Sequence, residues 1–291
     1  MRTLFVFLLT IDFMSMAGKV LAQNPENVFT YKVGSTEITL LSESQGQGNQ
    51  SILIDATPEM LQKYAPEGTF PNGTNAFFIR TPDRNILVDA GFGRNLFNNL
   101  QTIGITPDRV DVVLLTHMHG DHIGGMLQDG KPSFPKAEIY LAQPEYDYWV
   151  NDSRGQQARN VIEAYKDKLH LFQPLELVEL GQQGSPLISG IAGIAAYGHT
   201  PGHTVFLVES NHAQLLVWGD LTHAMAIQMP YPQVAVSYDV NPKDAVAYRK
   251  KILEYVEKNK IPVAGMHIAF PGIGTVTKDK TSGGYRFTPV H

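Results

Sequence analysis

The sequence contains no cysteine in its 291 residues. This absence excludes disulfide bonds, thiolate metal ligands, a cysteine nucleophile and a lipoprotein anchor. The chain also lacks any block of lysine or arginine, and its formal net charge is −5, so nucleic acid is not an expected partner. A metal site in this chain would have to be built from the imidazole and carboxylate ligands that divalent cations accept in place of thiolate.

Residues 1–22 have the pattern of an export signal. An early positive charge and an apolar run too short to span a bilayer precede small residues at a cleavage point after Ala22. Cleavage after Ala17 is a second option, and a cytoplasmic protein with an unstructured or strand-forming N-terminus is the alternative. We expect residues 23–291 to form a single domain that is periplasmic or secreted, without a membrane anchor.

The stretch 117–122 reads H-x-H-x-D-H. It follows Val110–Leu115, an apolar run rich in β-branched residues that predicts a buried strand. On an extended loop, side chains two residues apart point to the same side, so His117 and His119 can converge on one point. Asp121 and His122 can face a second point nearby as the chain turns into a helix. Imidazole and carboxylate at this spacing predict a metal site on a loop at the end of a strand.

Three further predicted strand ends carry residues of the same kind. They are His199 in the stretch G-H-T-P-G-H, Asp220 after an apolar run, and His267 after the last predicted core strand. We expect Asp89 and His203 to hydrogen-bond around these ligands rather than to bind metal themselves.

Strands and helices alternate along the chain, which predicts an α/β protein. Residues 29–33 and 37–41 are expected to form two strands, followed by a polar insertion over residues 42–74 that contains a helix starting at Pro58. A helix over residues 156–169 is expected in the middle of the chain, and the best helical pattern begins at Pro242.

The order H-x-H-x-D-H, G-H-T-P-G-H, G-D and a late histidine resembles the metallo-β-lactamase-fold hydrolase superfamily. This resemblance implies a four-layer αβ/βα sandwich with two metals at one edge of two facing sheets. It implies that the first metal is bound by His117, His119 and His199 and the second by Asp121, His122 and His267. Asp220 would bridge the two metals.

Three segments narrow the resemblance to the methyl parathion hydrolase group, a near relative of the acyl-homoserine lactonases. They are residues 143–149, 217–223 and 267–272. The resemblance implies an aromatic pocket over the metals, for which Phe92, Trp149 and Phe270 are the candidates, although each would serve equally well in a core. The lactonases carry a tyrosine three residues after the bridging aspartate, whereas this chain carries His223.

We therefore expect a dinuclear hydrolase that uses a metal-bridging hydroxide on an ester-like bond, either a lactone or a phosphotriester. Asp121, Asp220 and His223 are the predicted catalytic residues, and His223 also belongs to the predicted substrate pocket. Two divalent metal ions are expected, with Zn²⁺ favoured and Mn²⁺, Co²⁺ or Fe²⁺ also compatible with the ligands. The partner would be a small-molecule substrate, and the early insertion is compatible with a homodimer.

Other activities of the same fold remain open. A glyoxalase-II-like thioesterase and a mononuclear-iron persulfide dioxygenase share the ligand motif. A zinc β-lactamase is less well supported because that class normally lacks the bridging aspartate. A binding protein that kept only the fold would be expected to lose ligands, and this chain has the full set.

Overall fold

The computed structural model describes residues 27–179 and 187–290, so the predicted export signal lies outside the described residues. Seven strands form one sheet in the order β1-β2-β4-β5-β6-β9-β10. Their bounds are β1 Val28–Val33, β2 Thr36–Asn49, β4 Thr69–Arg80, β5 Asn85–Val88, β6 Val112–Leu114, β9 Glu138–Ala142 and β10 Leu169–Phe172. From β5 onward the neighbours pair in parallel, whereas β1, β2, β4 and β5 pair antiparallel.

The second sheet has six strands in the order β11-β12-β13-β15-β16-β17. Their bounds are β11 Ile191–Ala195, β12 Thr204–Ser210, β13 Ala213–Val217, β15 Val263–Ala264, β16 Ile273–Lys278 and β17 Tyr285–Pro289. Two short ribbons pair β3 (Leu53–Ile54) with β14 (Ala235–Val236) and β7 (Leu127–Gln128) with β8 (Lys131–Pro132).

Seven α-helices flank the sheets in the described part of the chain. They are α1 Pro58–Tyr64, α2 Leu96–Thr102, α3 Gly120–Ile123, α4 Gln143–Asn151, α5 Gln156–Ala164, α6 Met225–Gln228 and α7 Pro242–Asn259. The side chains of Thr57 and Asn241 accept a backbone N–H at the starts of α1 and α7, and a proline follows each cap, as the sequence predicts. No helix among the described residues is long and apolar enough to cross a membrane.

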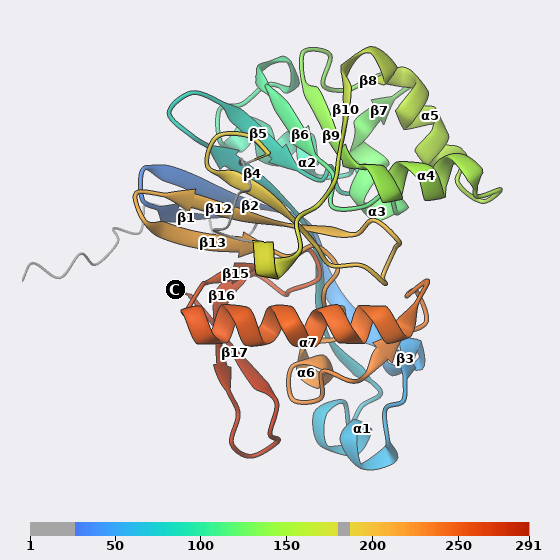
Figure 1. Ribbon diagram of the computed structural model, residues 1–291, viewed down its shortest axis with the longest axis vertical. Coiled ribbons are helices and arrows are strands. Elements are labelled where there is room, and N and C mark those ends of the chain that lie inside the picture. The colour runs from blue at the N-terminus through green and yellow to red at the C-terminus, as the bar shows by residue number, and fades with distance from the viewer. Residues whose placement is uncertain (1–26, 180–186, 291) are drawn as a thin grey trace, which may run out of the picture.

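Three apolar clusters show that the sheets and helices are stacked in four layers. One cluster joins the facing surfaces of the two sheets, for example Phe77 of β4 with Phe206 of β12. A second packs α2, α3, α4 and α5 on the outer face of the seven-stranded sheet, and a third packs α7 on the outer face of the six-stranded sheet. Figure 1 shows the long α7 lying across the orange and red strands, with α4 and α5 beside the green ones. The expected α/β four-layer sandwich is confirmed.

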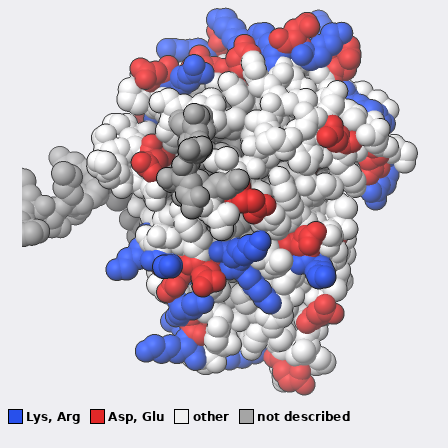
Figure 2. Space-filling view, in the orientation of Figure 1, with Lys and Arg blue, Asp and Glu red and all other residues white. Residues whose placement is uncertain are grey.

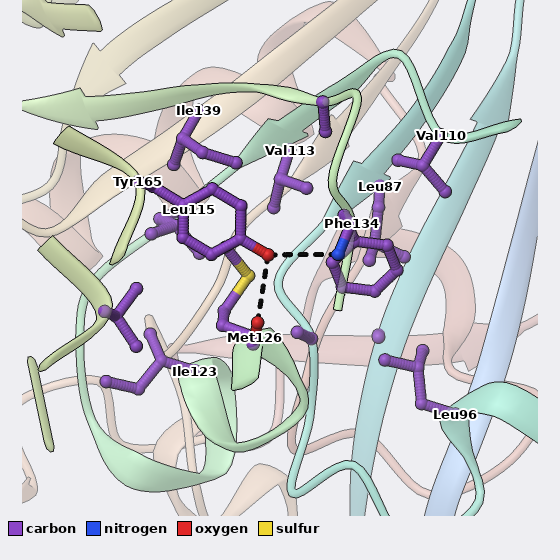
Figure 3. Packing of buried hydrophobic residues seen from close by; sticks show 14 of the residues in the cluster. Leu87, Leu96, Val110, Val113, Leu115, Ile123, Met126, Phe134, Ile139 and Tyr165 are labelled. Atoms are coloured by element: carbon purple, nitrogen blue, oxygen red, sulfur yellow. Dashed lines mark hydrogen bonds between the residues drawn. The ribbon is translucent and has the colours of Figure 1, made fainter. Parts of the chain in front are cut away.

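The apolar core beneath α2 to α5 contains the buried hydroxyl of Tyr165, whose hydrogen bonds are satisfied. The hydroxyl of Tyr165 donates to the carbonyl oxygen of Met126 at 2.9 Å and accepts from the backbone N–H of Phe134 at 3.0 Å. Figure 3 shows both bonds among apolar side chains such as Ile139 and Leu115. A buried hydroxyl without partners would be destabilising, so this pair of bonds lets a tyrosine pin the loop before β7 to the loop before β9.

The expected polar insertion over residues 42–74 is instead largely two long strands. β2 and β4 stay paired from Glu37↔Arg80 to Asn49↔Thr69, with a register shift between Ser42 and Ser44. The part of this ladder that pairs residues 44–49 with residues 69–74 is called the β2–β4 arm. The prediction missed the arm because residues 44–49 are mostly exposed, so no alternation of apolar and polar residues marks them as a strand. The arm carries β3 and α1, and Figure 1 shows α1 at the opposite end of the molecule from α5.

The helix expected over residues 156–169 is also shorter in the structure. α5 ends at Ala164, and Leu169–Phe172 forms β10, which pairs in parallel with β9. This backbone pairing spans about 30 residues of sequence, a contact that local periodicity does not reveal.

On the surface, positive and negative residues are interspersed on the face shown in Figure 2, with wide uncharged areas between them.

Candidate metal centre

All seven predicted ligands lie on loops or helix starts that follow strands of both sheets. His117 and His119 follow β6, while Asp121 and His122 lie in the first turn of α3. The six-stranded sheet supplies the other three ligands, which are His199 between β11 and β12, Asp220 after β13 and His267 after β15. The two sheets therefore meet at one edge through these side chains, and the structure brings all of them into one cluster.

The first group consists of three imidazole nitrogens and one carboxylate oxygen. Nδ1 of His119 lies 2.9 Å from Nε2 of His117 and 2.9 Å from Nε2 of His199. Oδ2 of Asp220 lies 3.3 Å from Nε2 of His199 and 3.7 Å from Nε2 of His117. The nitrogens of His117 and His199 lie within hydrogen-bond distance of that of His119, so the lone pairs of the neutral rings can converge on one point. A divalent cation at that point would be bound by all three.

The second group is made of one aspartate and two histidines. Oδ2 of Asp121 lies 3.8 Å from Nε2 of His122 and 3.5 Å from Nε2 of His267. Oδ1 of Asp220 lies 3.1 Å from Nε2 of His122, and both of these atoms are buried without a hydrogen-bond partner among the described residues. Buried polar atoms normally have partners. The donor set and these two orphaned atoms therefore fit a second divalent cation, with Asp220 shared between the groups.

The tautomers of four histidines agree with metal binding. Nδ1 of His122 lies 2.6 Å from Oδ2 of Asp89, and Nδ1 of His199 lies 3.0 Å from Oδ1 of Asp239. Nδ1 of His267 faces the carbonyl oxygen of Gly73 at 2.9 Å. These oxygens accept, so each Nδ1 carries the proton and Nε2 keeps its lone pair for a metal.

The fourth histidine, His117, is oriented through Thr116. The hydroxyl of Thr116 donates to Asp89 and lies 3.1 Å from Nδ1 of His117, from which it can accept. Asp89 also accepts from the backbone N–H of Thr116 at 2.8 Å, so it lies beside the ligands as the sequence suggested.

Two further residues support the ligands, and only one of them was predicted from the sequence. Nε2 of His203 accepts from the backbone N–H of Asp220 at 2.9 Å while its Nδ1 faces the carbonyl oxygen of Ala196, which agrees with the expected supporting role. Asp239 was not anticipated. It lies 40 residues from His199, in a loop before α7, and no local pattern marks it.

Burial and neighbouring charges shift the pKa values of the ligands in both directions. Burial, together with neighbouring histidines, lowers the pKa of His119 to about 3 and holds that of His117 well below its usual value. Burial raises the pKa of Asp220, but the surrounding histidines, His122 first, lower it well below its usual range. Burial lowers the pKa of His199, but Asp220 and Asp239 raise it to about 9, so protons and a metal ion compete for this nitrogen.

His223 lies closer to the ligands than its predicted pocket role required. Its Nε2 is 3.0 Å from Oδ2 of Asp220, its ring stacks on that of His267, and its Nδ1 is buried without a partner among the described residues. Burial lowers the pKa of His223 to about 4, so the ring is neutral at pH 7. With Asp220 and His267 it forms a third group of metal-ligand type.

A cavity of about 980 Å³ opens over the ligands. Phe92, Trp149 and His223 line it, as expected, and so do the exposed rings and side chains of Tyr238 and Val240. Phe270 is not among the residues that line this cavity, so its predicted pocket role stays a prediction. Its ring packs edge-on against Phe29 at 6.3 Å, in the cluster between the sheets.

Residues 69–260, more than half of the chain, match the family described as the metallo-beta-lactamase superfamily. The chain belongs to this superfamily. The resemblance inferred from the motifs is thereby confirmed, and the His/Asp groups indicate divalent metal binding, as in other metal-dependent hydrolases of this superfamily.

Two solved structures share almost the whole fold. The hydrolase AbOPH is 27% identical, with a TM-score of 0.80 over 92% of this chain and 99% of its own. AidC, described as a dizinc quorum-quenching lactonase, is 24% identical, with a TM-score of 0.82 over 91% of this chain and 98% of its own, and shows the shared fold.

Curated relatives match over a smaller part of the chain. The lactamase-like protein ptaB of Pestalotiopsis fici is 27% identical over 53% of this chain, and the match spans only 42% of that relative's length. Acyl-coenzyme A thioesterase MBLAC2 of Gallus gallus is 25% identical over 65% of this chain and 70% of its own. These names cover more than one activity, so the substrate class has to be inferred from the cavity.

Proposed function

We propose that this protein is a dinuclear metal-dependent hydrolase of uncharged ester-like bonds, with lactones preferred over phosphotriesters. The observation that carries the proposal is the pair of ligand groups that both contact Asp220 and face a single cavity with aromatic residues in its walls. In this proposal one cation is held by His117, His119 and His199, the other by Asp121, His122 and His267, and Asp220 contacts both. Zinc is the first candidate because imidazole-rich sites with carboxylates are typical of it, although Mn²⁺, Co²⁺ and Fe²⁺ accept the same ligands.

Bound divalent cations would supply Lewis acidity, which lowers the pKa of water and polarises a carbonyl or phosphoryl oxygen. The chain's own residues provide orientation and proton transfer. His223 is neutral at pH 7 and carries one ring proton, and its ring lines the cavity next to Asp220. As a neutral ring it can take a proton from the attacking water and deliver it to the leaving alkoxide, or donate a hydrogen bond to the oxygen that becomes negative.

The cavity walls favour a substrate with an apolar part. Phe92, Tyr238 and Val240 are three of the five large apolar side chains that are exposed in the described part of the chain, and all three line the cavity. Exposed apolar groups that gather in one hollow commonly mark a binding site. They would cover the apolar part of a substrate and exclude water from the reacting bond.

The cavity offers little to hold a carboxylate. Among the described lining residues, Arg154 is the only lysine or arginine, and its guanidinium already pairs with both carboxylate oxygens of Asp152 at 3.1 and 2.7 Å. A β-lactam carboxylate would have to compete with this pair for Arg154. We therefore place β-lactams last among the substrates.

The test is a hydrolysis panel with the purified protein and its metal content measured in parallel. The panel contains γ- and δ-lactones, aryl phosphotriesters, aryl esters, thioesters and a cephalosporin. We expect two metals per chain and the highest kcat/KM for a lactone. Faster turnover of the cephalosporin would reject the ranking, and a preference for thioesters would favour the thioesterase alternative. One iron per chain with oxygen uptake would instead identify a dioxygenase.

We also infer that the protein is exported, because residues 1–22 have the features of a signal peptide. N-terminal sequencing of the protein from its native host should give a start near residue 23, or near residue 18. An intact Met1 on cytoplasmic material would contradict export but not the chemistry, because every proposed ligand lies at His117 or later.

A further inference from the structure

A buried carboxylate that the sequence did not single out lies behind the first ligand group. Glu145 is in α4, and none of its surface is exposed. Its Oε1 accepts from the backbone N–H of Met118 at 3.0 Å and from Nε1 of Trp149 at 2.5 Å. Its Oε2 accepts from the backbone N–H of Gly202 at 3.0 Å. A buried carboxylate is costly unless it is hydrogen-bonded, so a specific arrangement of donors is required here.

These donors belong to both loops that carry the first ligand group. Met118 stands between His117 and His119, and Gly202 lies three residues after His199. The first loop follows β6 of the seven-stranded sheet, and the second connects β11 to β12 of the six-stranded sheet. One carboxylate thus joins two segments that are 84 residues apart in the sequence.

The second loop also packs closely against the backbone of Glu145. A Cβ atom added to Gly202 would lie 2.1 Å from the backbone nitrogen of Glu145, so only glycine lets the second loop approach α4 this closely. The third donor, Trp149, lies in the cavity wall, and its ring contacts that of His119 edge-on at 5.6 Å. Glu145 is therefore hydrogen-bonded both to a residue of the cavity wall and to the loops that carry the first ligand group.

We propose that Glu145 is a positioning residue that holds the two ligand loops of the first metal at the distance at which His117, His119 and His199 converge. Trp149 is held in the cavity wall by the same carboxylate. The inference rests on the two-metal centre proposed above and not on any particular substrate. The second ligand group has no direct bond to Glu145, so its affinity for metal is not affected in this scheme.

The decisive experiment measures metal binding rather than turnover. Metal-free protein is titrated with Zn²⁺ against a chelating indicator, and the two binding steps are assigned with His199→Ala and His267→Ala, which remove one ligand from the first and second group respectively. In Glu145→Gln an amide NH₂ replaces one acceptor and faces a donor N–H. We expect the first binding step to weaken by about 10–100-fold, the range for loss of outer-shell support, while the second step stays within about 3-fold.

Glu43→Gln is the matched control. Glu43 is also a buried carboxylate, and it accepts from the backbone N–H groups of Arg94 and Asn95 at the start of α2, away from the first ligand loops. We expect this variant to lower the thermal midpoint about as much as Glu145→Gln does, with the first binding step unchanged. Trp149→Phe keeps a ring in the wall but removes one donor, and it should weaken the first step by only a few fold.

Two results would overturn the proposal. One is a folded Glu145→Gln protein with wild-type affinity in the first step. The other is an equal loss in both steps, or an equal loss in Glu43→Gln, which would mean that any buried carboxylate only supports the fold. A single Zn²⁺ binding step in the wild type would instead contradict the two-metal proposal itself, so the two failures are distinguishable.

Discussion

The two ligand groups are held in different ways although they share Asp220. The first group is backed by two carboxylates, Glu145 behind both loops and Asp239 behind His199, which are parts of α4 and of the loop before α7. The second group is backed by one carboxylate, Asp89, at His122 and by a backbone carbonyl at His267.

The exposure of the ligands does not separate the two groups. Each group has two buried ligands and one partly exposed ligand, which is His119 in the first group and Asp121 in the second. The supporting carboxylates are therefore the main difference between the groups. We expect the first metal to bind more tightly and the second to exchange more readily.

Substitution of Asp220, which contacts both ligand groups, has the largest expected effect on metal binding and turnover. Asp220→Ala takes away the negative charge that the two proposed metal sites share, whose ligand nitrogens lie 3.1 to 3.7 Å from the carboxylate oxygens. At least one metal should dissociate, and turnover should fall by about 10³-fold or more, because both the metal and its water-activating role are lost. Elemental analysis and kcat measure this. Two tightly bound metals in Asp220→Ala would show that Asp220 does not bridge.

Substitution of His223 separates proton transfer from metal binding. His223→Phe keeps a ring of similar size against His267 but removes the proton donor, so kcat should fall by about 10²–10⁴-fold, the contribution typical of a general acid or base. The metal content should stay at the wild-type value. Full activity would assign His223 to a structural role, and a lost metal would place it among the ligands, which its distance of 3.0 Å to Asp220 also allows.

The carboxylates behind the histidines test whether each group responds to its own support. Asp239→Asn should weaken the first binding step, and Asp89→Asn the second, by about 10–100-fold each. Asp89 also accepts from the N–H and hydroxyl of Thr116 next to His117, so we expect its variant to weaken the first step as well, but less. Stepwise Zn²⁺ titration checks both. A crossed result, with Asp239→Asn affecting only the second step, would contradict the assignment of the groups.

The sequence predicted the residues of the His/Asp cluster much better than the residues that support them. His117, His119, Asp121 and His122 are neighbours on one loop, and each distant ligand follows an apolar run, so a strand-end pattern was enough to find them. Asp239 and Glu145 act over 27 to 57 residues of sequence, and neither lies in a pattern that shows where its partners will fold.

Solvent exposure explains why the long strands were missed, whereas packing decides where the aromatic residues lie. The β2–β4 arm is exposed on residues 44–49, so the hydrogen-bonded ladder there left no hydrophobic period in the sequence. An aromatic residue beside a ligand motif can point toward the cavity, as Trp149 does, or into the core, as Phe270 does. Only the packing of the two sheets decides between the two.

The smallest expected effect concerns the hydrogen bond that supports His267. Its partner is the backbone carbonyl oxygen of Gly73, so no side-chain deletion removes this bond. Gly73→Ala acts on that carbonyl indirectly, since the new Cβ would lie 2.8 Å from the carbonyl oxygen of Ile268 and the backbone must shift. We expect the second binding step to weaken by about 2–10-fold, toward the lower end of outer-shell effects, with the first step unchanged. Gly46→Ala, on the paired strand, is the matched control, because a Cβ there meets nothing within 4 Å. Equal binding in the two variants would show that the second group tolerates movement of its backbone support. The difference between the groups would then rest on the carboxylates alone.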